Sequence, residues 1–190
     1  VWAGFEIRDK SFNYSIEESE SILADKFLEK FKRPIVGIQL KASSWVRNPV
    51  PDEILRLIRM LRYNNFTVIV MDNQQFGFKD EGIINMSGGY NIREVAAIIQ
   101  KVDLMITPDS GLMHFAGFFG KPTICLFGGS DYKCRLKYYP TAIPISKGKE
   151  VCNQYPCWSH SYYCPRGINP APCMQAIKAE DVFDIVRQIL

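Results

Sequence analysis

The sequence lacks the features that would point to a membrane or a nucleic acid. No apolar run approaches the roughly 18 residues of a membrane-spanning helix. The start, VWAGFEIRDK, lacks the basic, apolar and small-residue order of a secretion signal. The 23 basic and 20 acidic residues leave a net charge of only +3 without a long run of one sign, which argues against a phosphate-tracking surface. We therefore expect a soluble cytoplasmic protein with no transmembrane segment and no nucleic-acid partner.

Repeats, low-complexity tracts and a dividing linker are also missing. With 190 residues, of which 47% are hydrophobic and 23% charged, the chain has the composition of one well-buried globular domain. We expect a single unit over residues 1–190. The first residue is Val1 rather than Met, which leaves open that the chain is a processed product or a piece of a longer protein.

Short β-branched runs alternate with segments of helical periodicity over much of the sequence. Strands are expected at 35–40, 66–71, 83–86, 103–107 and 123–127. Within a leading segment, 1–33, a helix is expected from a capping box at 15–18 to about residue 32. Further helices are expected at about 52–64, 91–101, 109–120 and 174–190, whereas 131–173 is expected to be an irregular, cysteine-rich segment. This alternation predicts an α/β fold in which helices cover both faces of a mostly parallel, Rossmann-like sheet.

The stretch TPDSGLMHFAGFFGKPTICLFG, residues 107–128, places polar residues between an expected strand and an expected helix. Ligands of open parallel sheets bind beyond the carboxyl ends of the strands, where the first amides of the next helix attract anions. Gly111 has no Cβ, so a phosphate can approach the backbone closely. Asp109 or Ser110 is expected to cap the helix or to bond a ligand hydroxyl. His114, one turn further, either reaches the same crevice or is a core histidine.

Two basic residues follow the first expected strand. Lys41 and Arg47 flank a loop at the sheet edge where Asp109 is also expected. Either side chain can reach a diphosphate there, or it can serve only as solubilising surface charge.

The 107–128 stretch resembles a motif of glycosyltransferase family nine, the lipopolysaccharide heptosyltransferases. Asp-Ser-Gly-Leu-Met-His at 109–114 is followed by Gly-Lys-Pro-Thr and by an apolar strand that ends in Leu-Phe-Gly. The first strand, Arg-Asn-Pro at 47–49 with the helix behind it, Asn-Met-Ser-Gly-Gly at 85–89, and the late cysteines with the terminal helix are also similar to this family. The resemblance therefore runs from about residue 30 to the end.

The resemblance implies the C-terminal, Rossmann-like domain of a two-domain GT-B glycosyltransferase. Such a domain binds a nucleotide-diphosphate sugar, such as ADP-heptose, for transfer to a lipopolysaccharide or to another glycan or protein acceptor. The motif positions expected around the sugar donor are Arg47, Asp109, Ser110, Gly111, Leu112 and His114, and Lys41 joins them from its place in the basic loop. Arg47, Asp109 and His114 are the expected catalytic residues. No catalytic metal is expected, because basic side chains and helix-end amides stabilise the leaving diphosphate.

The sequence also departs from the family's pattern. Pro108 stands where Asn is usual, Asn48-Pro49 replaces a basic-Trp pair, and Gly129 stands where Pro is usual. The residues before the first strand are too few for the family's N-terminal domain, which holds the acceptor and the general base. We therefore expect an incomplete active site that needs an N-terminal acceptor domain or a partner chain. The departures leave open a second function, a non-catalytic assembly module with a degenerate glycosyltransferase fold.

Four of the six cysteines crowd the irregular segment, at Cys152, Cys157, Cys164 and Cys173. Their spacing is wider than the paired cysteines, about two to four residues apart, of most structural zinc sites. A structural zinc or iron ion with these four ligands, disulfides and free thiols all remain open, although a cytosolic setting argues against disulfides. His160 is a further candidate ligand. Because no Cys-x-x-Cys pair is present, a thiol redox protein is the third and weakest interpretation.

Overall fold

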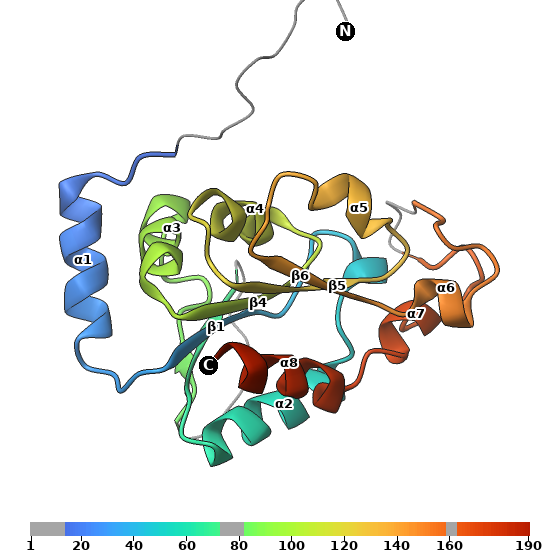
Figure 1. The fold of residues 1–190 in the computed structure, drawn as a ribbon, viewed down its shortest axis with the longest axis horizontal. Coiled ribbons are helices and arrows are strands. Elements are labelled where there is room, and N and C mark those ends of the chain that lie inside the picture. The colour runs from blue at the N-terminus through green and yellow to red at the C-terminus, as the bar shows by residue number, and fades with distance from the viewer. Residues whose placement is uncertain (1–13, 73–81, 159–162) are drawn as a thin grey trace, which may run out of the picture.

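Six parallel strands form one sheet in the order β3-β2-β1-β4-β5-β6 (Figure 1). The structure is a computed structural model that describes residues 14–72, 82–158 and 163–190. The strands are β1 (Ile35–Gln39), β2 (Thr67–Met71), β3 (Ile84–Asn85), β4 (Leu104–Pro108), β5 (Thr123–Phe127) and β6 (Ala142–Ser146). This order is that of doubly wound nucleotide-binding sheets, whose crevice lies where the winding direction reverses, here between β1 and β4. The expected Rossmann-like α/β fold is confirmed.

Helices cover both faces of the sheet (Figure 1). The helices α2 (Pro51–Tyr63) and α8 (Ala179–Ile189) pack together on one face, and α3 (Ile92–Lys101) and α4 (Gly111–Phe118) lie on the other. The first helix, α1 (Glu18–Leu28), packs against α3 at the edge of the molecule. The shorter helices are η1 (Trp45–Arg47), α5 (Tyr132–Arg135), α6 (Gly148–Val151) and α7 (Pro172–Gln175).

Successive side chains of β1 enter two separate apolar clusters. Val36 and Ile38 belong to the cluster that includes α2 and α8, whereas Ile35 belongs to the cluster that includes α1, α3 and α4. The side chains of a strand point alternately to the two faces of the sheet, so a run that is apolar throughout is buried throughout. The sheet is thereby held rigidly between its helices, and its carboxyl edge is a firm base for a site.

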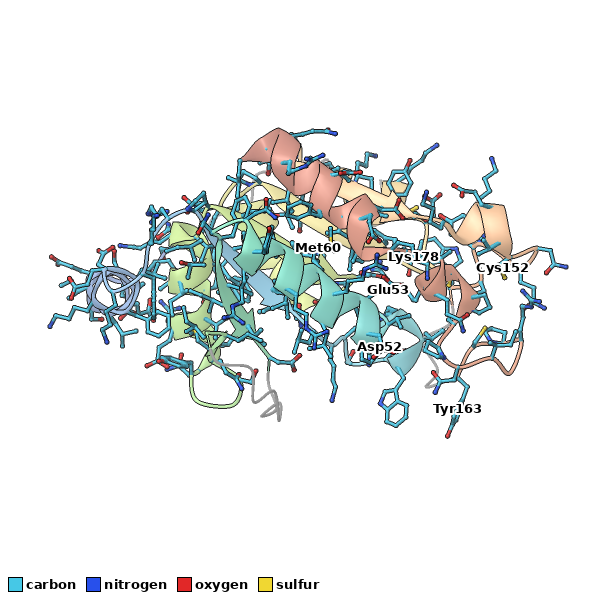
Figure 2. The ribbon with its side chains drawn as sticks, turned by 90° about the horizontal axis from the view of Figure 1, so that it is seen from below. Asp52, Glu53, Met60, Cys152, Tyr163 and Lys178 are labelled. Carbon is cyan, nitrogen blue, oxygen red and sulfur yellow. The ribbon has the colours of Figure 1, made fainter. Side chains whose placement is uncertain are left out.

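A polar contact joins α2 to the start of α8. The carboxylate of Glu53 accepts hydrogen bonds from Nζ of Lys178 at 2.9 Å and from the amide of Ala179 at 3.0 Å. Figure 2 shows Glu53 and Lys178 lying close together between the two helices. The hydrogen bond from Lys178 holds the pKa of the Glu53 carboxyl below its usual range. A carboxylate at a helix N-terminus also interacts favourably with the helix dipole.

Two of the expected helix ends are confirmed. The side chain of Asn91 caps α3 by accepting hydrogen bonds from the amides of Arg93 and Glu94. Gly120 follows α4 with a φ of +62°, the left-handed conformation in which glycine carries no steric cost.

The expectations for the leading and terminal segments were partly wrong. The first helix begins after Glu17, which forms a capping box with Glu20, and it ends at Leu28 rather than near residue 32. The chain must leave the helical conformation before Pro34, because a residue that precedes proline disfavours it. The expected terminal helix, 174–190, is two helices, α7 and α8, because the chain turns between Gln175 and Ala179. Residues 1–13 of the leading segment lie outside the described residues.

The segment 131–173 is less irregular than expected, because it contains β6. The sequence pattern did not indicate this strand, because Pro144 lies in its middle. Proline is tolerated in an edge strand, where an amide need not pair, and β6 is an edge of this sheet. In the ranges that the structure describes, no helix is both long and apolar enough to cross a bilayer.

Candidate functional site

A pocket of about 490 Å³ opens at the carboxyl ends of β1 and β4. This is the point where the winding of the sheet reverses, and the volume lies within the range of small-molecule sites. All of the residues expected around the sugar donor line it: Lys41, Arg47, Asp109, Ser110, Gly111, Leu112 and His114. Segments that are more than sixty residues apart in the sequence thus meet in one cavity, as the parallel topology requires.

The turn from β4 into α4 does not cap its helix with a side chain. Ser110 occupies the N-cap position, but its side chain makes no capping hydrogen bond. Its hydroxyl instead donates a hydrogen bond to Oε1 of Gln39, at the end of β1. The same oxygen accepts a hydrogen bond of 2.9 Å from the hydroxyl of Thr107. The expectation of a Ser110 or Asp109 cap was therefore wrong, because tertiary partners take both side chains. Among the described residues, the first amides of α4 consequently have no capping side chain at the pocket, which favours an anion there.

Asp109 is a buried carboxylate between two arginines. Its side chain is 5% exposed, and its Oδ2 accepts a hydrogen bond of 3.0 Å from the hydroxyl of Ser130. Nη1 of Arg47 lies 3.8 Å from Oδ2 and donates to the backbone oxygen of Asp109 at 2.7 Å. Nε of Arg135 lies 3.6 Å from the same Oδ2. Asp109 therefore holds two guanidinium groups at the pocket.

His114 is half-buried and bonded through Nδ1 to the hydroxyl of Tyr139, at 2.8 Å. Burial lowers the pKa of His114, although the charge of Asp109 opposes this, and burial raises the pKa of Tyr139. Both shifts favour the uncharged forms of the two side chains. A phenol that donates to Nδ1 leaves the ring hydrogen on Nε2, from which the ring can donate to a ligand.

Gly117 makes room for this arrangement. A Cβ at Gly117 would lie 2.5 Å from two ring carbons of Tyr139, so only glycine lets the ring lie against α4.

The pocket also contains residues that the sequence argument missed. Gln39 and Asp72 lie at the ends of β1 and β2, and Arg135 lies in α5 beyond β5. Gln39 and Asp72 share one signal, their position at the carboxyl end of a strand, whereas Arg135 lies in a helix beyond β5 and has no such signal. Tyr90, Ile92 and Val95, around the start of α3, supply an apolar wall.

The four late cysteines come together away from this pocket. Cys152, Cys157, Cys164 and Cys173 line a second, almost filled cavity of about 10 Å³. No disulfide joins any of the six cysteines, all of which the structure describes, so the disulfide alternative was wrong. Burial raises the pKa of the Cys173 thiol to about 11. Among the described residues, no group of three or more potential ligands is arranged to hold a metal ion, and His160 lies outside those residues.

Known proteins share this sequence pattern and this fold. The model of glycosyltransferase family 9 (heptosyltransferase) matches residues 3–160. The lipopolysaccharide core heptosyltransferase OpsX of Haemophilus influenzae is 44% identical over 43 residues, which are 23% of this chain and 12% of that protein.

Two solved structures have similar folds. The ADP-heptose lipopolysaccharide heptosyltransferase II of E. coli matches with a TM-score of 0.71 and 16% identity, over 92% of this chain and 52% of that one. The iron-containing dodecameric glycosyltransferase TibC of enterotoxigenic E. coli matches with a TM-score of 0.66 and 20% identity, over 84% of this chain and 47% of that one. The chain thus spans about half the length of these two structures and a smaller part of OpsX.

Proposed function

The chain belongs to glycosyltransferase family 9, and on this basis we propose that its pocket binds a nucleotide-diphosphate sugar as the donor site of a glycosyltransferase. The observation that carries the proposal is the convergence of the helix start at Gly111, the cation of Arg47 and the ring of His114 on one cavity at the β1–β4 reversal.

The diphosphate belongs at the start of α4. There the free amides of the first turn, the Arg47 guanidinium and Nε2 of His114 offer hydrogen bonds to phosphate oxygens. The same groups stabilise the negative charge that grows on the diphosphate as the glycosidic bond to it breaks. Asp109 is a positioning residue in this scheme, because it is buried behind the arginines.

The nucleoside belongs against the wall formed by Tyr90, Ile92 and Val95, which is apolar enough for a base. The matched E. coli structure is named for ADP-heptose, so we propose ADP-heptose or a similar sugar nucleotide as the donor. The matched parts of the solved structures are about half of each chain. We therefore propose that transfer to a lipopolysaccharide, other glycan or protein acceptor needs a second, acceptor-binding half, and that the reaction takes place in the cytoplasm.

Calorimetric titration with ADP, UDP and GDP tests the proposal. We expect one of these nucleotides to bind with one site per chain, and both Arg47→Ala and His114→Ala to weaken its binding at least tenfold. Arg59→Ala, which removes an exposed arginine on α2, is the matched control and should bind normally. If no nucleotide binds, the proposal is wrong and the non-catalytic assembly module is favoured instead.

We also propose that the cysteine cavity holds a structural zinc or iron ion. Four thiols that line one cavity are a ligand set that both metals accept, although their side chains would have to rotate toward a common centre. The similar protein TibC is described as iron-containing. Elemental analysis of purified protein should give about one metal ion per chain. Negligible metal, with all six thiols titratable, would favour free thiols.

A further inference from the structure

We propose that Arg135 is a second arginine that binds the diphosphate, and that Trp158 of the cysteine-rich segment holds it in place. This inference rests on the proposed function and extends the site beyond the residues of the family-like motif. It assigns part of the cysteine-rich segment, residues 155–158, to the support of the donor pocket.

Arg135 and Arg47 reach the pocket from opposite sides of β4. Arg47 comes from η1, which follows β1, and Arg135 comes from α5, which follows β5. Both approach Oδ2 of Asp109, at 3.8 Å and 3.6 Å, so this carboxylate can balance only one of the two cations. The pair therefore presents an excess positive charge next to the first turn of α4. A diphosphate placed there lies between two guanidinium groups, which are suited to bidentate bonds with phosphate oxygens.

The hydrogen-bonding capacity of Arg135 is not used up within the described structure. Its Nε is buried without a hydrogen-bond partner, and 3.6 Å from Oδ2 of Asp109 is too long for a good bond. Its side chain remains 34% exposed at the pocket. An arginine of this kind is held in place but retains donors for a ligand.

Trp158 provides the holding contact. The guanidinium carbon of Arg135 lies 5.8 Å from the centre of a Trp158 ring, within the range of a cation–π interaction. The backbone of Trp158 is anchored nearby, because its amide donates to the carbonyl of Gly129 at 3.1 Å. Gly129 follows β5 closely, so the indole is tied to the same sheet edge as the pocket.

The neighbours of Trp158 strengthen this link. Sγ of Cys157 packs so close to Gly129 that a Cβ there would lie 2.5 Å from it. The hydroxyl of Tyr155 donates to the carbonyl of Ser130 at 3.4 Å, and the Ser130 side chain in turn donates to Asp109. Residues 155–158 thus contact the supports of both Arg135 and Asp109, and the order of this short segment should influence the affinity for a diphosphate.

Parallel titrations with ADP and AMP test the inference, because only ADP carries the second phosphate. We expect Arg135→Ala to weaken ADP binding at least tenfold and AMP binding less than threefold. Arg135→Lys keeps the charge but loses the planar fork, so it should recover only part of the loss. Trp158→Leu should reduce the preference for ADP over AMP, whereas Trp158→Phe should retain most of it. Unfolding curves identify any variant that is merely misfolded.

The outcomes separate this inference from the proposed function. Wild-type protein that binds no nucleotide overturns both. If the wild type binds ADP but the Arg135→Ala variant keeps the wild-type ratio of ADP to AMP affinity, only the role of Arg135 is overturned. If the Arg135→Ala variant loses this ratio but the Trp158→Leu variant keeps it, only the supporting role of the indole is overturned. Arg59→Ala is again the control and should leave the ratio unchanged.

Discussion

Replacement of Gly111 by alanine should separate stability from ligand binding. Gly111 is the first residue of α4 and lines the pocket. A Cβ at this position would have no heavy atom within 4 Å, and the backbone is not in the left-handed region. The folded protein therefore accepts the methyl group without strain. Alanine has fewer conformations than glycine in the unfolded chain, so Gly111→Ala should raise the free energy of unfolding by roughly 0.4–1 kcal/mol.

The same substitution should weaken the binding of the ligand. The space that the methyl group enters is the space through which a diphosphate approaches the first amides of α4. Displacement of the phosphate from these amides should raise the dissociation constant for ADP at least tenfold, which is about 1.4 kcal/mol. Denaturant unfolding measures the first effect, and calorimetric titration measures the second.

Gly120→Ala is the matched control. A Cβ at Gly120 would also meet nothing within 4 Å, but φ is +62° and the residue does not line the pocket. We expect this variant to lose about 1 kcal/mol of stability, because the left-handed conformation is unfavourable for alanine, and to bind ADP normally. The reasoning would be refuted by a Gly111→Ala variant that binds ADP as tightly as the wild type, or by one that is less stable than Gly120→Ala.

Two further predictions concern the supports of the fold and the site. Glu53→Gln removes a carboxylate whose pKa is lowered by Lys178, so it should cost about 1 kcal/mol at pH 7. This difference should be complete above the ordinary carboxyl range, shrink as the pH falls into that range, and vanish only below the lowered pKa of Glu53 in the folded state. Acid unfolding of both proteins measures it. Tyr139→Phe removes the hydroxyl on Nδ1 of His114. If this phenol donates to Nδ1 and so holds the ring in the Nε2–H tautomer, the variant should show a mixture of tautomers. Nitrogen-15 NMR of the two histidines reads this directly, and an unchanged tautomer would contradict the assigned hydrogen bond.

The sequence was sufficient for strands β1 to β5 and for most of the residues at the carboxyl edge of β1 and β4. The strands at 35–40 and 103–107 were recognisable because they are buried on both faces and hence apolar throughout. Once these strands are parallel neighbours, Arg47 and Asp109 must lie at the same edge. This placement follows from topology and does not depend on side-chain detail.

What could not be predicted depends on tertiary contacts. Aspartate is a residue type that commonly caps helices, and only the position of Ser130 shows that the carboxylate of Asp109 is bonded elsewhere. Arg135 lies in a segment without periodicity, so no pattern indicated that it returns to the pocket. The missed strand β6 shows the same limit, since Pro144 is acceptable there only because β6 is an edge.

The central claim is that a nucleoside diphosphate binds at the start of α4. Amide NMR spectra of nitrogen-15-labelled protein, recorded during titration with ADP, test this claim most directly. We predict that the largest shifts occur at the amides of Gly111 and Leu112, and that the amides of 184–188 in α8 do not move. Shifts that are absent, or that are concentrated away from the β1–β4 edge, would contradict the account.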